Sequence, residues 1–278
     1  MINLLLNKYH FTFDLNFKCL LLIDCLKELD QKIMVTFQGA DIQIDKEINY
    51  GFRIDEKYNN YFKRIINKID HFFYISNTIK EDLMNLNISE KKMSFNPNSV
   101  EINKFENFKM DLNKRQKIHL ITVARYSEKK KGYDKLSNIS EGLIKNKIDF
   151  KWTIIGKNTL ELLKNDFIKK NLKYFEIIEN IDNINEAYFP HSKLIKKYVE
   201  SDLYINLSKI ESFGITYIEA LAANIPIITF NSKGVNEIVS DNYNGYILES
   251  NDQMIKKIME LYQNPSQISE IRKNLLSS

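Results

Sequence analysis

Residues 203–230 read LYINLSKIESFGITYIEALAANIPIITF, and this stretch decides the fold. An apolar run of strand length at 203–207 is followed by a polar loop at 208–214, a helical segment at 215–223 and a second apolar run at 225–230. Two short buried strands joined by a helix favour a parallel sheet with a right-handed crossover. Ligands of open parallel sheets bind beyond the carboxyl ends of the strands, so this polar loop is the first candidate for a binding site.

The same alternation continues on both sides of this stretch. Short apolar runs and helical segments occupy 118–123, 132–144, 152–155, 175–178, 194–199 and 246–248, and a further helical stretch begins at Leu160. Short buried strands separated by helices of this length predict a doubly wound α/β domain of about 170 residues, which we place at 109–278.

The N-terminal part shows fewer strands. Buried strands are predicted at 34–37, 72–75 and 93–95, a fourth at 11–13, and helices at 17–29 and 60–69. The segment 101–116 is polar and without clean periodicity, so we place the linker between domains there. The sequence therefore predicts a second, smaller α/β domain over 1–108.

The composition is that of an ordinary soluble globular protein, with 44% of the 278 residues hydrophobic and 27% charged. The net charge of +4 is small, and no basic stripe interleaved with aromatic residues indicates nucleic acid as a partner. The most apolar stretch, 19–26, is too short to span a bilayer, and residues 1–6 lack the cationic start of a secretory signal. Cys19 and Cys25 lie in one apolar run and are interpreted as core residues in a reducing compartment. We expect a cytoplasmic protein.

Basic residues gather at two places, with Lys63, Arg64 and Lys68 on one predicted helix and a lysine run at 129–131. Lysines mixed with acidic residues usually mark only a solvated surface. The alternative is that these residues contact phosphate, or anionic lipid as a peripheral protein at the inner face of the membrane.

Two glutamates flank the start of the helix at 215–223. Glu211 lies in the loop and Glu219 about two turns into the helix, so both carboxylates can face one cleft. Gly214 permits close approach of a ligand to the backbone, and the free N–H groups of a helix N terminus suit phosphate or sugar oxygens. For an isolated pair, the alternative is an acid favoured by the helix dipole and a second acid on a solvated helix face.

The wider pattern resembles the donor-site signature of the retaining family-four glycosyltransferases, which have the GT-B fold. It comprises ESFGITYIEALAANIPII at 211–228, GVNEIV at 234–239 and NGY at 244–246, with Ser212 and Asn224 where glycines are usual. The resemblance implies an α/β protein with two Rossmann-like domains facing a cleft.

The resemblance also implies a role for each residue of this signature. Glu211 would act in catalysis by positioning the donor sugar, and Glu219 would hold the ribose of the donor. The remaining donor-binding residues of this stretch would be Ser208, Phe213, Gly214, Ile215 and Thr216.

A second block, VARYSEKKKGYD at 123–134, resembles the strand-end arginine and Lys-Gly pair of the same family. Arginine offers a planar fork and lysine a point charge, and together they would clamp a diphosphate whose charge grows as it leaves. The resemblance therefore makes Arg125 and Lys131 catalytic. The spacing is one residue longer than expected, so Lys130 competes with Lys131. Gly156 fits the family's strand-Gly turn near the nucleotide, and equally fits an ordinary strand-ending glycine.

Two turns of the N-terminal part resemble the acceptor side of the family. NPNSV at 96–100 resembles the Pro-Asn-Gly-Val-Asp step that closes the first domain, and TFQGAD at 36–41 resembles a Phe-His-Gly-x-Asp turn that faces the acceptor. The resemblance places Gln38 and Asp41 on the acceptor side. Gln38 replaces the family's histidine and cannot titrate, but it could bind a sugar hydroxyl.

No group of histidine, cysteine and carboxylate residues has the spacing of a metal site, and His71 and His191 are interpreted as structural. This suits an enzyme that uses cationic side chains and needs no metal or other cofactor.

The resemblance implies a hexosyltransferase-like enzyme of surface polysaccharide biosynthesis. It would move a sugar from a nucleotide-diphosphate sugar to a saccharide or lipid-linked acceptor, with retention at the anomeric carbon. The family's opening strand, glycine-rich loop and next βα units have no match before Met34, so we expect a shortened N-terminal domain. The alternative is a truncated, inactive or partner-dependent protein that only binds a sugar nucleotide. A dehydrogenase is disfavoured because the chain contains no Gly-x-Gly-x-x-Gly.

Overall fold

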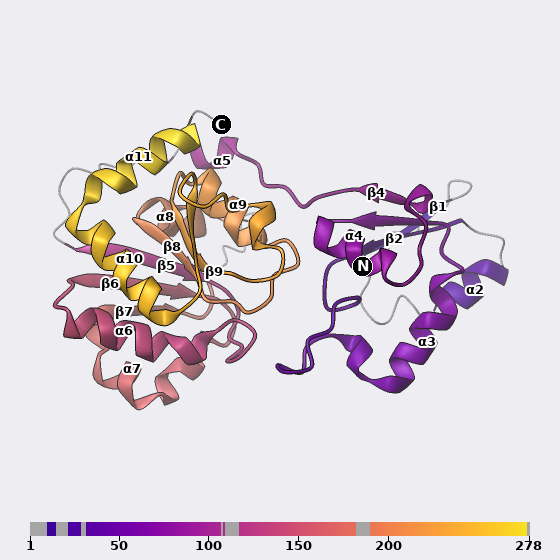
Figure 1. Ribbon diagram of the computed structural model, residues 1–278, viewed down its shortest axis with the longest axis horizontal. Helices are drawn as coiled ribbons and strands as arrows, with labels where there is room; N and C mark the ends of the chain where they lie inside the picture. Colours follow the sequence, from indigo (N-terminus) through magenta and orange to yellow (C-terminus); the bar gives the residue numbers. More distant parts are fainter. Residues whose placement is uncertain are drawn as a thin grey trace. The chain divides into compact units, whose positions relative to one another are not determined.

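The computed structural model describes residues 10–14, 22–28, 32–106, 108, 117–181 and 190–276 (Figure 1). The chain divides into two compact units, Met1–Asn98 and Ser99–Ser278. This division lies before the boundary that we predict at residue 108. The reason is that α5 (Asn103–Glu106) packs on α8 (Ser192–Val199) of the second unit, and Phe105 of α5 is buried.

The second unit is built on a parallel sheet, which among the described residues has the strand order β10-β9-β8-β5-β6-β7. Its strands are β5 (Ile118–Val123), β6 (Phe150–Ile155), β7 (Phe175–Ile178), β8 (Leu203–Asn206), β9 (Ile227–Phe230) and β10 (Gly245–Leu248). The chain proceeds from β5 outward to β7 and then returns to place β8 on the other side of β5. This reversal is the topological switch point, where ligands of such sheets bind.

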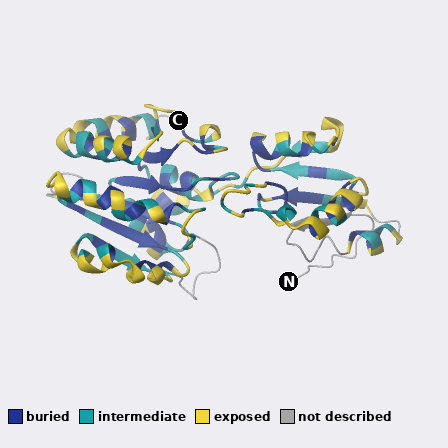
Figure 2. Cartoon of the chain, turned by 60° about the horizontal axis from the view of Figure 1, so that its bottom comes forward, coloured by how far each residue is buried: buried dark blue, intermediate teal, exposed yellow. Residues whose placement is uncertain are grey.

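Helices cover both faces of this sheet, and for that reason its strands form continuous apolar runs in the sequence. Successive strand residues point to opposite faces. Leu120 packs in one core with α6, α7, α10 and α11, and Ile121 packs in the other with α8 and α9. Figure 2 shows the buried strands between partly exposed helices. The remaining helices of this unit are α6 (Leu136–Lys145), α7 (Asp166–Lys170), α9 (Ile215–Ala222), α10 (Asn251–Gln263) and α11 (Pro265–Leu276).

These elements confirm the predicted α/β fold with a parallel sheet, and they differ from the prediction in detail. The helical stretch expected from Leu160 is the 3-10 helix η4 (Thr159–Lys164) followed by the short α7. The sequence pattern did not predict α10 and α11. Shorter 3-10 segments are η3 (Tyr133–Lys135), η5 (Leu172–Tyr174) and η6 (Val235–Glu237).

The first unit contains a parallel sheet in the order β1-β2-β3-β4. Its elements are β1 (His10–Asp14), α2 (Ile23–Glu28), β2 (Lys32–Phe37), η1 (Phe52–Ile54), α3 (Glu56–Ile66), β3 (His71–Tyr74), α4 (Asn77–Met84), η2 (Glu90–Lys92) and β4 (Met93–Phe95). The strand predicted at 11–13 is therefore present. Helix α3 begins before the predicted residue 60, because the Asp55 side chain accepts a hydrogen bond from Tyr58 N at 2.8 Å and caps it.

One prediction about the first unit is wrong. Cys25 is exposed, whereas Ile23 and Leu26 of the same helix are buried. Residues three apart share one face of a helix, and Cys25 lies off the face that these two residues form. Cys19 lies outside the described residues. No described helix is long and apolar enough to cross a membrane.

Candidate active site

Two loops meet where β5 and β8 end, and the backbone holds them together. Gly132 has a φ of 70°, and a Cβ atom there would lie 1.9 Å from the Leu207 carbonyl oxygen, so only glycine fits. The Lys209 N–H donates to the Lys130 carbonyl oxygen at 3.0 Å. The loop after β5 is thus fixed against the loop after β8, and their side chains are brought together.

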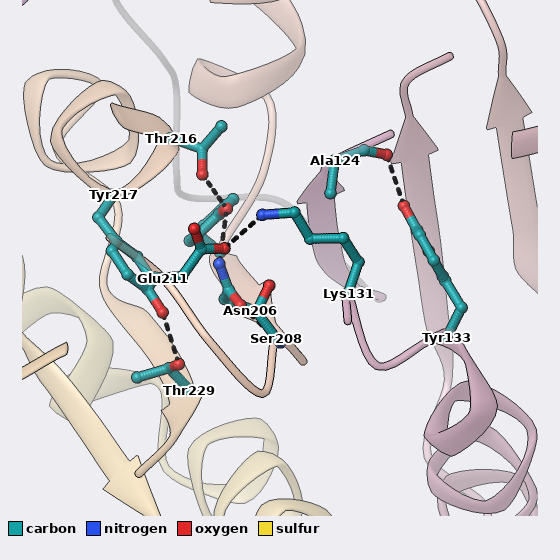
Figure 3. A network of polar contacts seen from close by, with 10 residues as sticks. Ala124, Lys131, Tyr133, Asn206, Ser208, Glu211, Thr216, Tyr217 and Thr229 are labelled. Atoms are coloured by element: carbon teal, nitrogen blue, oxygen red, sulfur yellow. Dashed lines mark hydrogen bonds and ion pairs between the residues drawn. The ribbon is translucent and has the colours of Figure 1, made fainter. Parts of the chain in front are cut away.

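The predicted residues Lys131 and Glu211 are in contact (Figure 3). Lys131 Nζ lies 2.6 Å from Glu211 Oε1, and the side chains are 16% and 10% exposed. Burial alone would raise the pKa of Glu211, but the charge of Lys131 and hydrogen bonds from Lys131 and Ser208 hold that pKa below its ordinary value. Glu211 is therefore ionised at neutral pH, and its charge is balanced by that of Lys131.

Lys130 and Arg125 of the first loop have different surroundings from Lys131. The pKa of Lys130 falls to about 8, chiefly through burial and also through the positive charges of Lys131 and Arg125. Arg125 is exposed just beyond the end of β5. Lys131 makes the contact with Glu211, and the charge of the competing Lys130 also helps to lower the pKa of Glu211. Lys131 and Lys130 both act on the Glu211 carboxylate, and Arg125 adds a third positive charge near Lys130. This excess of positive charge suits the binding of an anion.

Helix α9 begins just after Glu211. Gly214 precedes it with a φ of 71°, and a Cβ atom there would lie 2.4 Å from the Tyr217 ring, so glycine is required. The first N–H groups of an α-helix have no acceptor within the helix. Ile215 is exposed, and Phe213 and Thr216 are half-buried. The start of α9 therefore presents N–H groups and accessible side chains to a ligand.

Glu219 has a different partner from Glu211. Its side chain is fully buried, and Oε2 accepts a hydrogen bond from Tyr198 Oη of α8 at 2.8 Å. Its other oxygen, Oε1, is buried without a hydrogen-bond partner among the residues described. Burial raises the pKa of Glu219 to about 7. The alternative of a solvated helix face is therefore wrong for Glu219.

Gly156 and Ser208 shape the ends of two strands. Gly156 has a φ of 151°, and a Cβ atom there would lie 2.2 Å from the Ala124 carbonyl oxygen, so the chain after β6 approaches β5 too closely for a side chain. Ser208 is buried, and its N–H donates to Asn206 Oδ1 at 2.8 Å. Both predicted residues thus contribute to the form of the loops around the ion pair.

Three residues near the site were not predicted from the sequence. Tyr198 contacts Glu219, and Tyr204 and Asn206 lie on β8 beneath the loop. Asn206 Nδ2 donates to Tyr204 Oη at 3.4 Å, and Tyr204 Oη donates to Thr216 Oγ1 at 2.6 Å. The available signal was an amide and a phenol within the apolar run 203–207, since buried polar groups need hydrogen-bond partners.

The predicted acceptor-side residues lie in the first unit. Asp41 is buried and accepts hydrogen bonds from the N–H groups of Gln38 at 3.0 Å and Gly39 at 2.8 Å. Burial raises the pKa of Asp41 to about 6. Asp41 therefore closes the turn after β2. Gln38 is exposed, and its Oε1 accepts a hydrogen bond from Asn98 Nδ2 at 3.5 Å.

Much of the positive charge singled out in the sequence is balanced locally. Asp24 pairs with Arg64 at 3.2 Å and with Lys68 at 2.6 Å. Lys129 pairs with Asp134 at 3.1 Å. These pairs reduce the charge available for a membrane surface.

The described residues form no group of three or more histidine, cysteine, aspartate or glutamate side chains that could hold a metal ion. His71 Nε2 lies 2.9 Å from Ser94 Oγ on the neighbouring strand, which supports its structural interpretation. His191 directly precedes α8.

Comparison with known proteins places these features in a family. Residues 103–276 match the family model described as glycosyl transferases group 1. The chain is 28% identical over 156 residues to the alpha-monoglucosyldiacylglycerol synthase of Acholeplasma laidlawii, covering 55% of this chain and 37% of that protein. It is 25% identical over 235 residues to the amylovoran biosynthesis glycosyltransferase AmsK of Erwinia amylovora, covering 82% of this chain and 54% of that protein. The chain thus spans only part of the length of these relatives.

A solved structure supports the fold. The Anabaena protein HepE in complex with UDP superposes with a TM-score of 0.74 at 12% identity, covering 97% of this chain and 73% of that one. Similar structures of this kind are GT-B glycosyltransferases, and the predicted GT-B fold is confirmed. Because the family match covers more than half of the chain, this protein belongs to the glycosyl transferases group 1 family.

Proposed function

We propose that this protein binds a nucleotide-diphosphate sugar in its second unit and transfers the sugar, with retention at the anomeric carbon, to a saccharide or lipid-linked acceptor. The observation that carries the proposal is the buried ion pair of Lys131 and Glu211 at the topological switch point. Family membership supports a sugar-transfer reaction. The UDP in the similar HepE structure supports a nucleoside diphosphate as the ligand.

The diphosphate would lie against the cationic loop and the start of α9. As the bond between the anomeric carbon and the diphosphate oxygen breaks, negative charge grows on the diphosphate, and groups that stabilise this charge accelerate the reaction. Arg125 and Lys131 would be the catalytic cations, with Lys130 close to both. The N–H groups of Ile215 and Thr216 would add partial positive charge. With these groups in place, the proposal needs no metal cofactor.

The two glutamates would bind different parts of the donor. Glu211 is an ionised hydrogen-bond acceptor held in place by Lys131, which suits it to position hydroxyl groups of the sugar. A buried oxygen without a partner, such as Glu219 Oε1, costs about 1–3 kcal/mol. A ribose hydroxyl would supply the missing partner. This supports Glu219 as the ribose-binding residue.

For the acceptor side, we propose that Gln38 and Asn98 bind a hydroxyl group of the acceptor saccharide. Both are amides, which donate and accept hydrogen bonds and do not titrate. Asp41 would act indirectly, by fixing the turn that carries Gln38. Synthesis of a surface polysaccharide or a glycolipid is the process that the two named relatives support.

A binding and turnover experiment tests the proposal. A panel of UDP-, GDP- and ADP-sugars should contain one donor that raises the melting temperature of the protein, since a ligand of the folded state stabilises it. Arg125→Ala and Lys131→Ala should lose both this shift and sugar transfer. Lys129→Ala is the matched control, because Lys129 lies in the same loop and pairs with Asp134 at 3.1 Å.

Two results would change the proposal. Wild-type turnover in Arg125→Ala would remove that residue from the catalytic machinery. Binding of a nucleotide sugar with neither transfer nor donor hydrolysis would favour the alternative, a partner-dependent or inactive sugar-nucleotide-binding protein.

A further inference from the structure

A chain of hydrogen bonds runs beneath the loop after β8 and ends at the first turn of α9. The Ser208 N–H donates to Asn206 Oδ1 at 2.8 Å. Asn206 Nδ2 donates to Tyr204 Oη at 3.4 Å, and Tyr204 Oη donates to Thr216 Oγ1 at 2.6 Å. Figure 3 shows Asn206 and Thr216 close to Glu211. The family resemblance gave no role to Tyr204 or Asn206.

The direction of this chain is fixed at its first link. A backbone N–H can only donate, so the Asn206 oxygen faces Ser208 and the Asn206 NH2 group faces Tyr204. The Tyr204 oxygen accepts this hydrogen bond, and the Tyr204 hydroxyl donates its single proton in a hydrogen bond to Thr216. Tyr204 is fully buried, and burial raises its pKa far above the ordinary value, so the phenol keeps its proton.

The last link determines what Thr216 can offer to a ligand. The Thr216 oxygen accepts a hydrogen bond from the Tyr204 hydroxyl, so the Thr216 hydroxyl can donate its own proton in a second hydrogen bond. In the part of the chain that the structure describes, Thr216 donates this proton to no protein atom. The side chain is half-buried at the start of α9, so it is accessible from solvent.

We propose that Tyr204 and Asn206 are positioning residues that make the Thr216 hydroxyl a donor to a phosphate oxygen of the nucleotide sugar. The inference rests on the proposed function, because it assigns a further contact within the same donor site. A phosphate oxygen only accepts hydrogen bonds, so a hydroxyl whose oxygen is already occupied by Tyr204 is oriented for it before binding.

Calorimetric titration with UDP, GDP and ADP tests the inference. Thr216→Val removes the hydroxyl and should weaken binding of the preferred diphosphate by about 10-fold or more, as expected for a hydrogen bond to a charged group. Tyr204→Phe keeps the Thr216 hydroxyl but no longer fixes its orientation, and should weaken binding about 3- to 10-fold. The double variant should bind no more weakly than Thr216→Val alone, because the phenol acts only through the threonine.

Tyr217→Phe is the matched control. Tyr217 is also fully buried, its ring lies 6.0 Å from that of Tyr204, and its hydroxyl lies 2.9 Å from Thr229 Oγ1. This variant should bind the diphosphate as the wild type does. Thr216→Ser keeps a hydroxyl and should retain wild-type affinity. Because Thr216 is only half-buried, this variant should fold even if Tyr204→Phe does not.

The outcomes separate the inference from the proposed function. If the wild type binds none of the three diphosphates, the proposed function fails. If it binds one and Tyr204→Phe binds equally well, or if the two single effects add, the inference is overturned and the proposed function stands. Equal weakening for the corresponding nucleoside, which has no phosphate, would also overturn it, since a loss of that kind would come from the general shape of the site.

Discussion

Replacing Glu219 with glutamine should flatten the pH dependence of the stability of the second unit. Burial raises the pKa of Glu219 from its ordinary value of 4.5 to about 7. Between these two values the folded chain holds a proton on Glu219 and the unfolded chain does not. Unfolding then releases a proton, so the free energy of unfolding falls as the pH rises.

The magnitude follows from the size of the pKa change. One pH unit corresponds to about 1.4 kcal/mol, so the wild type should lose about 3 kcal/mol of stability between pH 4.5 and pH 7 through this group alone. Glutamine is neutral in both states and removes this dependence. Its buried NH2 group would carry a cost of about 1–3 kcal/mol that does not vary with pH. The difference in slope between the two proteins, and not the absolute stability, therefore isolates the carboxyl group.

Urea unfolding at pH 5, 6, 7 and 8 measures this difference. Trp152 is the one tryptophan of the chain and is fully buried in the second unit, so its fluorescence reports the unfolding of that unit. Glu141→Gln on α6 is the matched control, because the Glu141 side chain is exposed. Parallel stability curves for Glu219→Gln and the wild type would refute the reasoning, since they would mean that Glu219 titrates alike in the folded and unfolded chains.

Further predictions concern the ion pair, a strand end and the surface. Lys131→Ala should lower the free energy of unfolding by about 3–5 kcal/mol because it leaves a buried charge unpaired, and adding Glu211→Gln should restore most of the loss in the same urea assay. Gly156→Ala should cost at least about 1 kcal/mol, because φ is positive there and an added Cβ atom meets backbone atoms. It should lower the melting temperature by circular dichroism more than Gly142→Ala in α6, where the atoms nearest to an added Cβ belong to the Ile255 side chain. Equal shifts would contradict the backbone argument. Asp24→Asn should strengthen sedimentation with anionic vesicles several-fold, because it frees Arg64 of α3 and Lys68 just after that helix, the two residues that pair with Asp24. Failure of both proteins to sediment would argue against membrane contact.

The sheet of the second unit could be predicted from the sequence because parallel strands covered on both faces leave an unbroken apolar run. The run at 118–123 has the bounds of β5, and the run at 203–207 extends one residue past β8. Helices α10 and α11 were not predicted, although Met254, Ile258 and Leu261 of α10 are spaced along one buried face. That α10 and α11 contribute to the core became evident only from their packing against the sheet.

The site was predicted in part. The motif brought Lys131 and Glu211 to attention, and the structure joins them through loops that are distant in the sequence. The pattern could not show that Glu219 contacts Tyr198, because this contact depends on how α8 packs against α9. Tyr204 was not predicted as a site residue, because an aromatic residue in an apolar run is usually part of the core.

The ion pair joins residues separated by 80 positions in the chain. Lys131 belongs to the half of the domain that contains β5, β6 and β7, and Glu211 to the half that contains β8, β9 and β10. A fragment containing either half alone would carry only one of the two charges. A diphosphate that contacts both loops would therefore act as a bridge between the halves. Its binding should resist their separation, so that protection from proteolysis becomes a measure of how completely the domain has assembled.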